Sequence, residues 1–396
     1  MIMMTSWTPE GVWSERLGVL RARHLERKMR LLDGPAGPEM STSDGVKIGF
    51  CSNDYLGLAD DPVLKQAAMS AVTRWGTGAG ASRLVSGNQS PHEALERESA
   101  ALVGAEAAVL FASGYQANVG ALSALTTADD AIFSDQLVHA SLIDGARLSR
   151  AAVHVFRHGD MAHLETLLDT TEVPGIKLVV TDAVFSMDGD LARLDDIVQL
   201  AERHGALVYL DEAHSLGIMG PGGRGLAAAL GLSDRIAVTL GTFSKAFGVS
   251  GAFVAAGRDA VALLKSTARS LLYSTAPPAA LAETISASLG RAREADDLRA
   301  ALRDNIDIFR SLAADRGLEL SPSETPIQPI ITGTEARTMA VSEALWQRGF
   351  FVQGIRPPTV PPGTCRLRVT LSAKHTRQHI AGLVNALAEV LEEDGR

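Results

Sequence analysis

The sequence predicts an α/β protein whose core is a mostly parallel sheet covered by helices. Between about residues 50 and 280, short apolar runs alternate with stretches of helical periodicity, and this alternation is typical of such sheets. The chain has 396 residues, of which 46% are hydrophobic and 21% charged. That composition is ordinary for a globular protein, and the length is enough for a large core and two or three domains.

The central region contains the runs that we expect to form the sheet and its covering helices. The expected strands cover residues 108–111, 131–134, 153–157, 177–182, 206–210, 236–240 and 251–255. The expected helices cover residues 61–75, 90–103, 115–124, 142–149, 192–204 and 259–266. We therefore expect a seven-stranded mixed sheet that is mostly parallel.

The two ends of the chain have other patterns. Residues 14–32 are basic and helical in pattern, and the Gly-Pro-rich loop at 34–38 would stop that helix. Later segments are expected as a long helical link at 279–316, strands at 329–332 and 366–371, and helices at 336–348 and 377–393. The predicted division is an N-terminal helical arm (1–50), a large domain (51–282) and a small α+β C-terminal domain (283–396).

Composition excludes several classes of protein. A net charge of −9 argues against nonspecific nucleic-acid binding. Two cysteines, Cys51 and Cys365, cannot form a disulfide framework, and no Cys/His cluster has zinc spacing, so we expect no metal. No apolar run is long enough to span a membrane, and the first residues lack the pattern of a signal peptide. We expect a cytoplasmic enzyme.

Three chemically distinct side chains follow two neighbouring predicted strands. Asp211 and His214 come after the run 206–210, and Lys245 lies in a Gly/Ser/Thr turn after the run 236–240. Open α/β sheets bind ligands at the carboxyl ends of their strands. An amine, a carboxylate and an imidazole there suit pyridoxal 5′-phosphate (PLP), which needs an amine for its aldehyde, a carboxylate for its pyridinium nitrogen and donors for its phenolic oxygen.

Each member of this set also has a structural interpretation. Asp211 could cap a helix or pair with an arginine, and His214 could be an ordinary core or loop residue. The run Asp-Glu-Ala-His at 211–214 also resembles a helicase motif, but the upstream phosphate loop which that motif requires is missing. Gly-rich residues 76–80 do not follow a predicted strand, so they give little support to a dinucleotide site.

The best candidate for a phosphate site follows the expected strand 108–111. Backbone N–H groups at Gly114, Tyr115 and Gln116 would lie at a helix N-terminus, which is a natural anion site. Thr242, three residues before Lys245, could add a hydroxyl group. The alternative for Gly114 is a plain tight turn.

Other polar residues lie in the loops that follow strands. His139 could stack on a flat cofactor ring or simply begin a helix, and Ser186 could reach the phenolic side or belong to the turn before Asp-Gly. Arg356, with Thr359 nearby, lies in a proline-rich loop whose rigidity suits capture of a carboxylate by a guanidinium. Its alternative is a surface arginine.

Over nearly its whole length the chain resembles the α-oxoamine synthases, which are PLP enzymes of the aspartate-aminotransferase fold (fold type I). The motifs that carry the resemblance are Ser-Asn-Asp-Tyr-Leu-Gly-Leu at 52–58, Ser-Gly at 86–87, the run 110–118, His-Ala-Ser-Leu at 139–142, the run 184–190, Asp-Glu-Ala-His at 211–214, Gly-Arg-Gly at 223–225, the run 242–248 and Tyr-Ser-Thr at 273–275.

The resemblance implies a role for each matching residue. Lys245 would hold PLP and later remove the substrate α-proton, while Asp211 would face the pyridinium. The remaining implied cofactor contacts are His214 and Ser186 at the phenolic oxygen, His139 on the ring, Gly114, Tyr115 and Thr242 at the phosphate, and Thr275 at the phosphate of the neighbouring subunit of a homodimer. The implied substrate contacts are Arg356 at an α-carboxylate, Asn53 and Thr359 near the reacting group, and Arg30, at the end of the N-terminal helix, for the acyl substrate.

Four acyltransferase activities compete within the family. Its members join alanine to pimeloyl, glycine to acetyl, glycine to succinyl, or serine to palmitoyl thioesters. The runs 79–88, 355–361 and 366–371 are similar to the member of biotin biosynthesis that joins L-alanine to a pimeloyl thioester, carried by CoA or by an acyl-carrier protein. Alternatives are another member, such as the glycine C-acetyltransferase, and a non-catalytic partner subunit, which the presence of Lys245 disfavours.

Two positions depart from the family pattern. Asp182 stands where glutamate is usual and is one methylene shorter, and Ser244 stands where glycine is common before the lysine. Neither change removes a catalytic group.

Overall fold

The computed structural model describes residues 9–394 and divides them into two compact units. The larger unit comprises residues 53–303, and the smaller one joins the residues before 53 to residues 304–396. No helix within the described part of the chain is both long and apolar enough to cross a membrane. The three-part division at residues 50 and 282 remains a prediction about separate domains.

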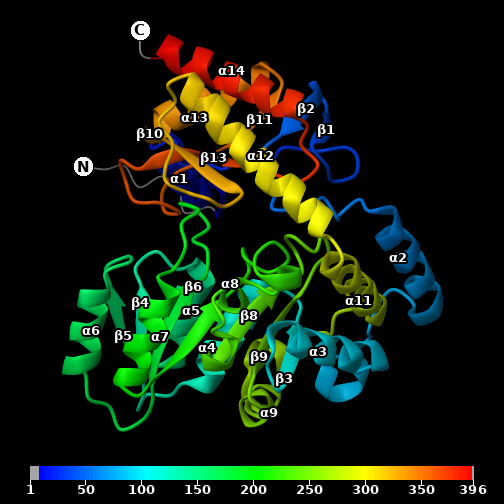
Figure 1. Ribbon diagram of the computed structural model, residues 1–396, viewed down its shortest axis with the longest axis vertical. Helices are drawn as coiled ribbons and strands as arrows, with labels where there is room; N and C mark the ends of the chain where they lie inside the picture. The colour runs from blue at the N-terminus through cyan, green and yellow to red at the C-terminus, as the bar shows by residue number, and fades with distance from the viewer. Residues whose placement is uncertain (1–8, 395–396) are drawn as a thin grey trace. The chain divides into compact units, whose positions relative to one another are not determined.

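The larger unit is built on a seven-stranded mixed sheet, as the sequence predicts (Figure 1). Its spatial order is β3-β9-β8-β7-β6-β4-β5, and β9 alone runs antiparallel to both neighbours. The bounds are β3 Ala107–Phe111, β4 Ala131–Asp135, β5 Ala152–Phe156, β6 Lys177–Asp182, β7 Ala206–Asp211, β8 Val238–Thr242 and β9 Ala252–Ala256. The carboxyl ends of the parallel strands therefore meet at one edge.

Helices cover both faces of this sheet because successive strand residues point to opposite sides. In β6, Leu178 and Val180 join one buried cluster, and Val179 between them joins the other. The helices are α2 Pro62–Trp75, α3 Ser90–Val103, α4 Gly114–Leu125, α5 Ala140–Ser149, α6 Met161–Thr170, α7 Leu194–Arg203, α8 Leu226–Ala229, α9 Arg258–Thr267, α10 Arg269–Leu272 and α11 Ala279–Arg293. Most expected elements are present, with ends displaced by one or two residues.

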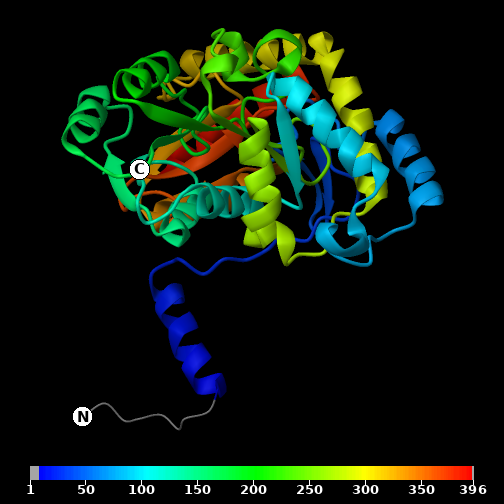
Figure 2. The ribbon, with the colours of Figure 1, turned by 90° about the horizontal axis from the view of Figure 1, so that it is seen from below.

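The smaller unit contains two three-stranded sheets. Its elements are α1 Pro9–Ala22, β1 Glu39–Thr42, β2 Gly45–Gly49, β10 Ile327–Gly333, α13 Glu335–Gln347, β11 Phe350–Phe351, β12 Gln353–Ile355, β13 Cys365–Thr370 and α14 Arg377–Asp394, with α12 Asp296–Asp315 leading into it. The parallel pairing of β2 with β11 joins the N-terminal segment to the C-terminal residues. Figure 2 shows α1 joined to this segment by an irregular stretch.

Two expected helical stretches differ in extent from those in the structure. The helix expected at 14–32 ends at Ala22, because His24 adopts a left-handed φ of 54° and Leu25 N–H bonds back to Leu20 O at 2.8 Å. Such a left-handed residue closes a helix end, so Arg30 lies beyond the helix. The long helical stretch expected at 279–316 is likewise divided, with α11 ending before Glu294.

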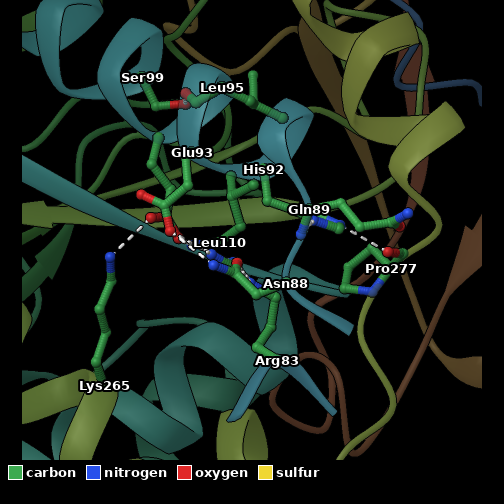
Figure 3. A network of polar contacts seen from close by, with 11 residues as sticks. Arg83, Asn88, Gln89, His92, Glu93, Leu95, Ser99, Leu110, Lys265 and Pro277 are labelled. Carbon is green, nitrogen blue, oxygen red and sulfur yellow. Dashed lines mark hydrogen bonds and ion pairs between the residues drawn. The ribbon is translucent and has the colours of Figure 1, made fainter. Parts of the chain in front are cut away.

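A buried carboxylate, that of Glu96, ties together three segments of the larger unit, which are marked in Figure 3 by the labelled residues Arg83, Leu110 and Lys265. Glu96 of α3 is 4% exposed and accepts hydrogen bonds from Arg83 Nη1 at 2.9 Å, Leu110 N at 3.1 Å and Lys265 Nζ at 2.8 Å. Leu110 belongs to β3, which leads into the predicted phosphate loop. Glu96 therefore helps to fix the base of that loop.

We expect Glu96→Ala to lower the free energy of unfolding by about 3 kcal/mol, because it leaves two cations and a strand N–H without their acceptor. The matched control is Glu93→Ala, since Glu93 is 46% exposed and lies 3.8 Å from Arg83; we expect less than about 1 kcal/mol there. Urea denaturation measures both. Equal losses would contradict the role given to Glu96.

Candidate active site

The predicted acid, histidine and lysine lie at the carboxyl edge of the large sheet. Asp211 is the last residue of β7, and Lys245 follows β8, its parallel neighbour, in which Leu240 pairs with Asp211. Lys245 lies in a turn closed by a hydrogen bond from Gly248 N to its carbonyl oxygen at 2.9 Å. Parallel pairing therefore brings the ends of the two strands together.

The Asp211 carboxylate is buried and held from two sides. It is 4% exposed, and its Oδ1 accepts from Ala213 N at 2.9 Å while Oδ2 accepts from Asn118 Nδ2 at 2.8 Å. Tyr209 OH donates to Asn118 Oδ1 at 2.8 Å, which fixes the orientation of that amide. Each carboxylate oxygen can accept a further hydrogen bond, so Asp211 is oriented and still able to bind a ring N–H.

Asn118 is a site residue that the sequence did not single out. It lies in α4, four residues after Gly114, and is 1% exposed. This spacing puts it one helical turn behind the predicted phosphate loop and on the same face. A buried amide at that spacing is the signal that could have identified it.

His139 and Asp182 form a second group at the same edge. His139 N donates to Asp182 Oδ2 at 2.9 Å, and Ser141 N donates to His139 Nδ1 at 3.3 Å. Desolvation lowers the pKa of His139; the charge of Asp211 opposes that shift and Lys245 adds to it. Burial raises the pKa of Asp182 well above its usual range, and Asp211 raises it further. Asp182 pairs with Asp211 in the register of β6 and β7, so these groups lie close together.

His214 is held by a tyrosine from a distant segment. Its Nδ1 lies 2.6 Å from Tyr55 OH, and both side chains are buried. Tyr55 belongs to the run 52–58, which also carries Asn53. Ser186 is half-buried in the turn after β6, and Thr275 is exposed in the chain after α10. Tyr55 is a second functional residue to which the sequence analysis gave no role.

The residues of the predicted anion site lie where α4 begins and β8 ends. Gly114 is the first residue of α4, and Gln116 N donates to the capping Ser113 Oγ at 3.3 Å. A Cβ at Gly114 would lie 3.9 Å from Thr242 Cβ, so the helix start faces the end of β8. Thr242 and Ser244 add hydroxyl groups that lie 2.8 Å apart. Backbone N–H groups and hydroxyls at a helix N-terminus suit a phosphate.

The smaller unit contains the predicted arginines, and it separates them. Arg356 is 3% exposed, with Nη2 bonded to Glu26 O at 2.5 Å and a buried Nε that has no partner in the described part of the chain. Burial lowers the pKa of Arg356, and the neighbouring charge of Arg27 lowers it further. Arg27 Nη2 donates to Thr359 Oγ1 at 3.2 Å. The guanidinium groups of Arg27 and Arg356 and the hydroxyl group of Thr359 thus lie close together.

Arg30 lies elsewhere in the same unit. Its guanidinium pairs with Glu343 Oε2 at 2.7 Å and stacks on the Trp346 ring at 3.8 Å. The sequence predicts Arg30 as the acyl-substrate arginine, but the structure puts Arg27 beside Thr359 and Arg356. The sequence analysis gave Arg27 no role, and the assignment of Arg30 to the acyl substrate stays a prediction.

The donor set in the larger unit fits PLP. It offers a lysine amine, an oriented buried carboxylate, and backbone and hydroxyl donors for a phosphate, which are the groups that this cofactor requires. These groups match the cofactor in chemical type. They also match it in placement, because all of them lie where the strands of one sheet end.

Comparison with known proteins defines the class. A family model described as aminotransferase class I and II matches residues 46–387. The chain belongs to this family, whose fold and PLP cofactor agree with the site described above.

Individual relatives narrow the class. An 8-amino-7-oxononanoate synthase of Aromatoleum aromaticum is 46% identical over 371 residues, covering 94% of this chain and 96% of the relative. The solved serine palmitoyltransferase of Sphingomonas wittichii is 29% identical, with a TM-score of 0.91 and 98% of each chain covered. An 8-amino-7-oxononanoate synthase of Francisella tularensis is 27% identical, with a TM-score of 0.75 over 88% of this chain and 99% of that one. The predicted membership of the α-oxoamine synthases is confirmed.

Proposed function

We propose that the protein catalyses the reaction of an 8-amino-7-oxononanoate synthase in biotin biosynthesis. L-Alanine and a pimeloyl thioester give 8-amino-7-oxononanoate, carbon dioxide and free thiol. The alanine Cα–H bond breaks, a bond forms between Cα and the thioester carbonyl, and the C–S bond breaks to release the thiol. The alanine carboxylate then leaves as carbon dioxide, and Cα takes up a proton. The observation that carries the proposal is the near-full-length similarity to relatives of that name at 46–48% identity. The run 355–361, which contains the buried Arg356, is similar to that member of the family and supports the choice of substrates.

The residues at the sheet edge have separate roles in proton transfer and in the stabilisation of charge. Bound PLP supplies an electron sink for the carbanion at the amino-acid Cα. Lys245 holds the cofactor through its amine until alanine takes its place, and then accepts the proton from Cα. Asp211 keeps a proton at the ring nitrogen, because its buried carboxylate stabilises positive charge there. Asn118 and Ala213 N keep that carboxylate in position.

The other residues of the larger unit bind the cofactor and orient it. We assign His139 to the face of the ring, and His214 and Ser186 to the phenolic oxygen, with Tyr55 fixing the His214 ring. Gly114, Tyr115 and Thr242 bind the phosphate. The Tyr115 hydroxyl donates to Asp144, so this residue contributes its backbone N–H. Thr275 would bind the phosphate of a second copy in a homodimer, and Asn53 would lie near the reacting group.

Carboxylate capture falls to the smaller unit. Arg356 retains an unused buried Nε–H, and a buried donor without an acceptor is costly unless a ligand supplies one. We assign Arg356 to the α-carboxylate of alanine, with Thr359 beside it. Arg27 is the better candidate than Arg30 for a further substrate carboxylate or thioester anion, because Arg30 already has Glu343 as its partner.

We expect Arg27→Ala to raise KM for a substrate about tenfold or more, the effect of losing one hydrogen bond to a charged group. Arg30→Ala is the matched comparison, and it should lower thermal stability slightly and leave KM nearly unchanged. Steady-state kinetics in both substrates measures this. A larger rise in KM for Arg30→Ala than for Arg27→Ala would instead assign the acyl substrate to Arg30.

A grid of substrates tests the proposed function. Alanine, glycine and serine are each combined with pimeloyl, acetyl, succinyl and palmitoyl thioesters, and products are identified by mass spectrometry. We expect the fastest turnover with alanine and pimeloyl-CoA or pimeloyl-acyl-carrier protein. Preference for glycine with acetyl-CoA would identify a glycine C-acetyltransferase instead, and preference for serine with palmitoyl-CoA would match the activity named for the Sphingomonas relative.

A further inference from the structure

One histidine near the site joins two carboxylates that belong to different strand ends. His158 Nδ1 lies 2.9 Å from Asp135 Oδ1, and its Nε2 lies 2.8 Å from Asp190 Oδ2. Asp135 ends β4 and is 3% exposed, while Asp190 closes the turn that follows β6. The edge of the His158 ring meets Phe185 of the same turn, with 4.4 Å between ring centroids.

This geometry requires a cation. A carboxylate only accepts hydrogen bonds, and a neutral imidazole has one N–H, so both ring nitrogens can donate only when the ring is protonated. Burial by itself lowers the pKa of His158, but the hydrogen bonds and charges of Asp135 and Asp190 raise it to about 10. The adjacent Arg157 is occupied by Asp160 at 2.7 Å. His158 is therefore an imidazolium at neutral pH.

The two carboxylates anchor the segments that bear the predicted cofactor contacts. Asp135 also accepts from Leu137 N at 2.8 Å and Gly159 N at 3.1 Å, so it shapes the loop that leads to His139. On the other side, Phe185 N donates to Asp190 O at 3.0 Å, which closes the turn around Ser186. His158 thus connects the loop before His139 with the turn that contains Ser186.

We propose that His158 is a positioning residue which, as an imidazolium, clamps the turn at 185–190 to the end of β4 and thereby sets Ser186 and His139 against the cofactor. The inference rests on the proposed assignment of those two residues to PLP. It adds a function for a histidine that lies outside the predicted catalytic set.

The test uses His158→Gln, which keeps a donor but removes the charge, with Asp190→Asn as the second variant. PLP is titrated into each apoprotein and the dissociation constant is measured by fluorescence, without thioester or alanine. We expect binding about tenfold weaker in each variant and kcat lower by about 10- to 100-fold, the effect of a small displacement of site groups. Because both variants break the same clamp, the double variant should lose little more than either one.

The pH dependence of stability distinguishes a charged clamp from ordinary packing of the His158 ring. The folded pKa of His158 is about 10, above the usual value of about 6.5. Its stabilisation is therefore complete below about pH 6.5 and is lost as pH rises through about 10. The gap in Tm between wild type and His158→Gln should therefore narrow as the pH rises from about 6.5 to about 10.

The matched control is His204→Gln, because His204 is a half-buried residue that follows α7 and bonds through its backbone N–H to Leu200 O and Ala201 O. Wild-type PLP affinity and kcat in His158→Gln, with a lowered Tm alone, would overturn the proposal. Should His158→Gln fail to fold, Asp190→Asn decides by the same measurements. Since PLP binding is measured without substrates, a wrong assignment of alanine or pimeloyl leaves this result unaffected.

Discussion

Lys245→Ala is expected to abolish turnover while leaving the fold and part of the PLP affinity. The amine is the group that holds the cofactor covalently and then accepts the Cα proton, so both roles disappear together. Loss of such a group lowers kcat by about 10⁴-fold or more. The phosphate donors at Gly114 and Thr242 and the Asp211 carboxylate remain, which is why noncovalent PLP binding should persist.

The measurements are the colour of the protein, covalent labelling by borohydride reduction, and product formation. Wild-type protein should be yellow, and borohydride reduction should label Lys245 covalently, whereas the variant should show no label. Lys65→Ala is the matched control, because Lys65 is an exposed lysine of α2 in the same unit, paired with Asp60. It should keep normal turnover and labelling. Substantial product formation by Lys245→Ala would remove the lysine from the mechanism.

The part of the site that could be predicted lies where local pattern decides placement. Asp211 and Lys245 each follow an apolar run, and once those runs are parallel neighbours, strand geometry alone brings the two side chains to one edge. The same holds for Gly114, which follows β3 and starts α4. The sheet, its helices and these residues therefore follow from periodicity and position.

The residues that were missed depend on contacts between distant segments. Tyr55 meets His214 across 159 positions of sequence, and nothing local in the run 52–58 indicates that partner. The positions of Arg27 and Arg30 could not be predicted from the sequence for a related reason. An expected helix through residue 32 would have put Arg30 at its end, but the left-handed His24 ends α1 early, and the irregular chain that follows decides which arginine reaches Thr359.

The short strands of the smaller unit escaped prediction because they carry almost no periodic signal. β11 has two residues and β12 three, and they exist because β2 and β13 offer them partners. Alternation needs at least four residues to be recognised. Their positions matter, because β12 leads directly into the loop that holds Arg356.

Asp211→Asn is expected to lower kcat by about 10²- to 10³-fold while the protein stays folded. The amide has nearly the same shape and can keep one bond to Ala213 N or Asn118. It carries no negative charge, so it cannot hold a proton at the ring nitrogen of bound PLP, and the carbanion at the substrate Cα loses its stabilisation. KM for alanine should change far less than kcat, since Asp211 does not bind the amino acid.

Glu212→Gln is the control that distinguishes charge at the ring from the loss of any buried carboxylate. Glu212 is the next residue and is 1% exposed, but it caps α8 by accepting from Leu226 N and Ala227 N, each at 2.8 Å. Burial raises the pKa of Glu212, and the hydrogen bonds that it accepts from Ser215 and from the N–H groups of Ala227 and Leu226 oppose that shift. Glu212→Gln should therefore lower stability more than turnover per folded molecule. If the two variants lost the same fraction of kcat, Asp211 would have only a structural role, and another carboxylate would have to hold the proton at the ring nitrogen.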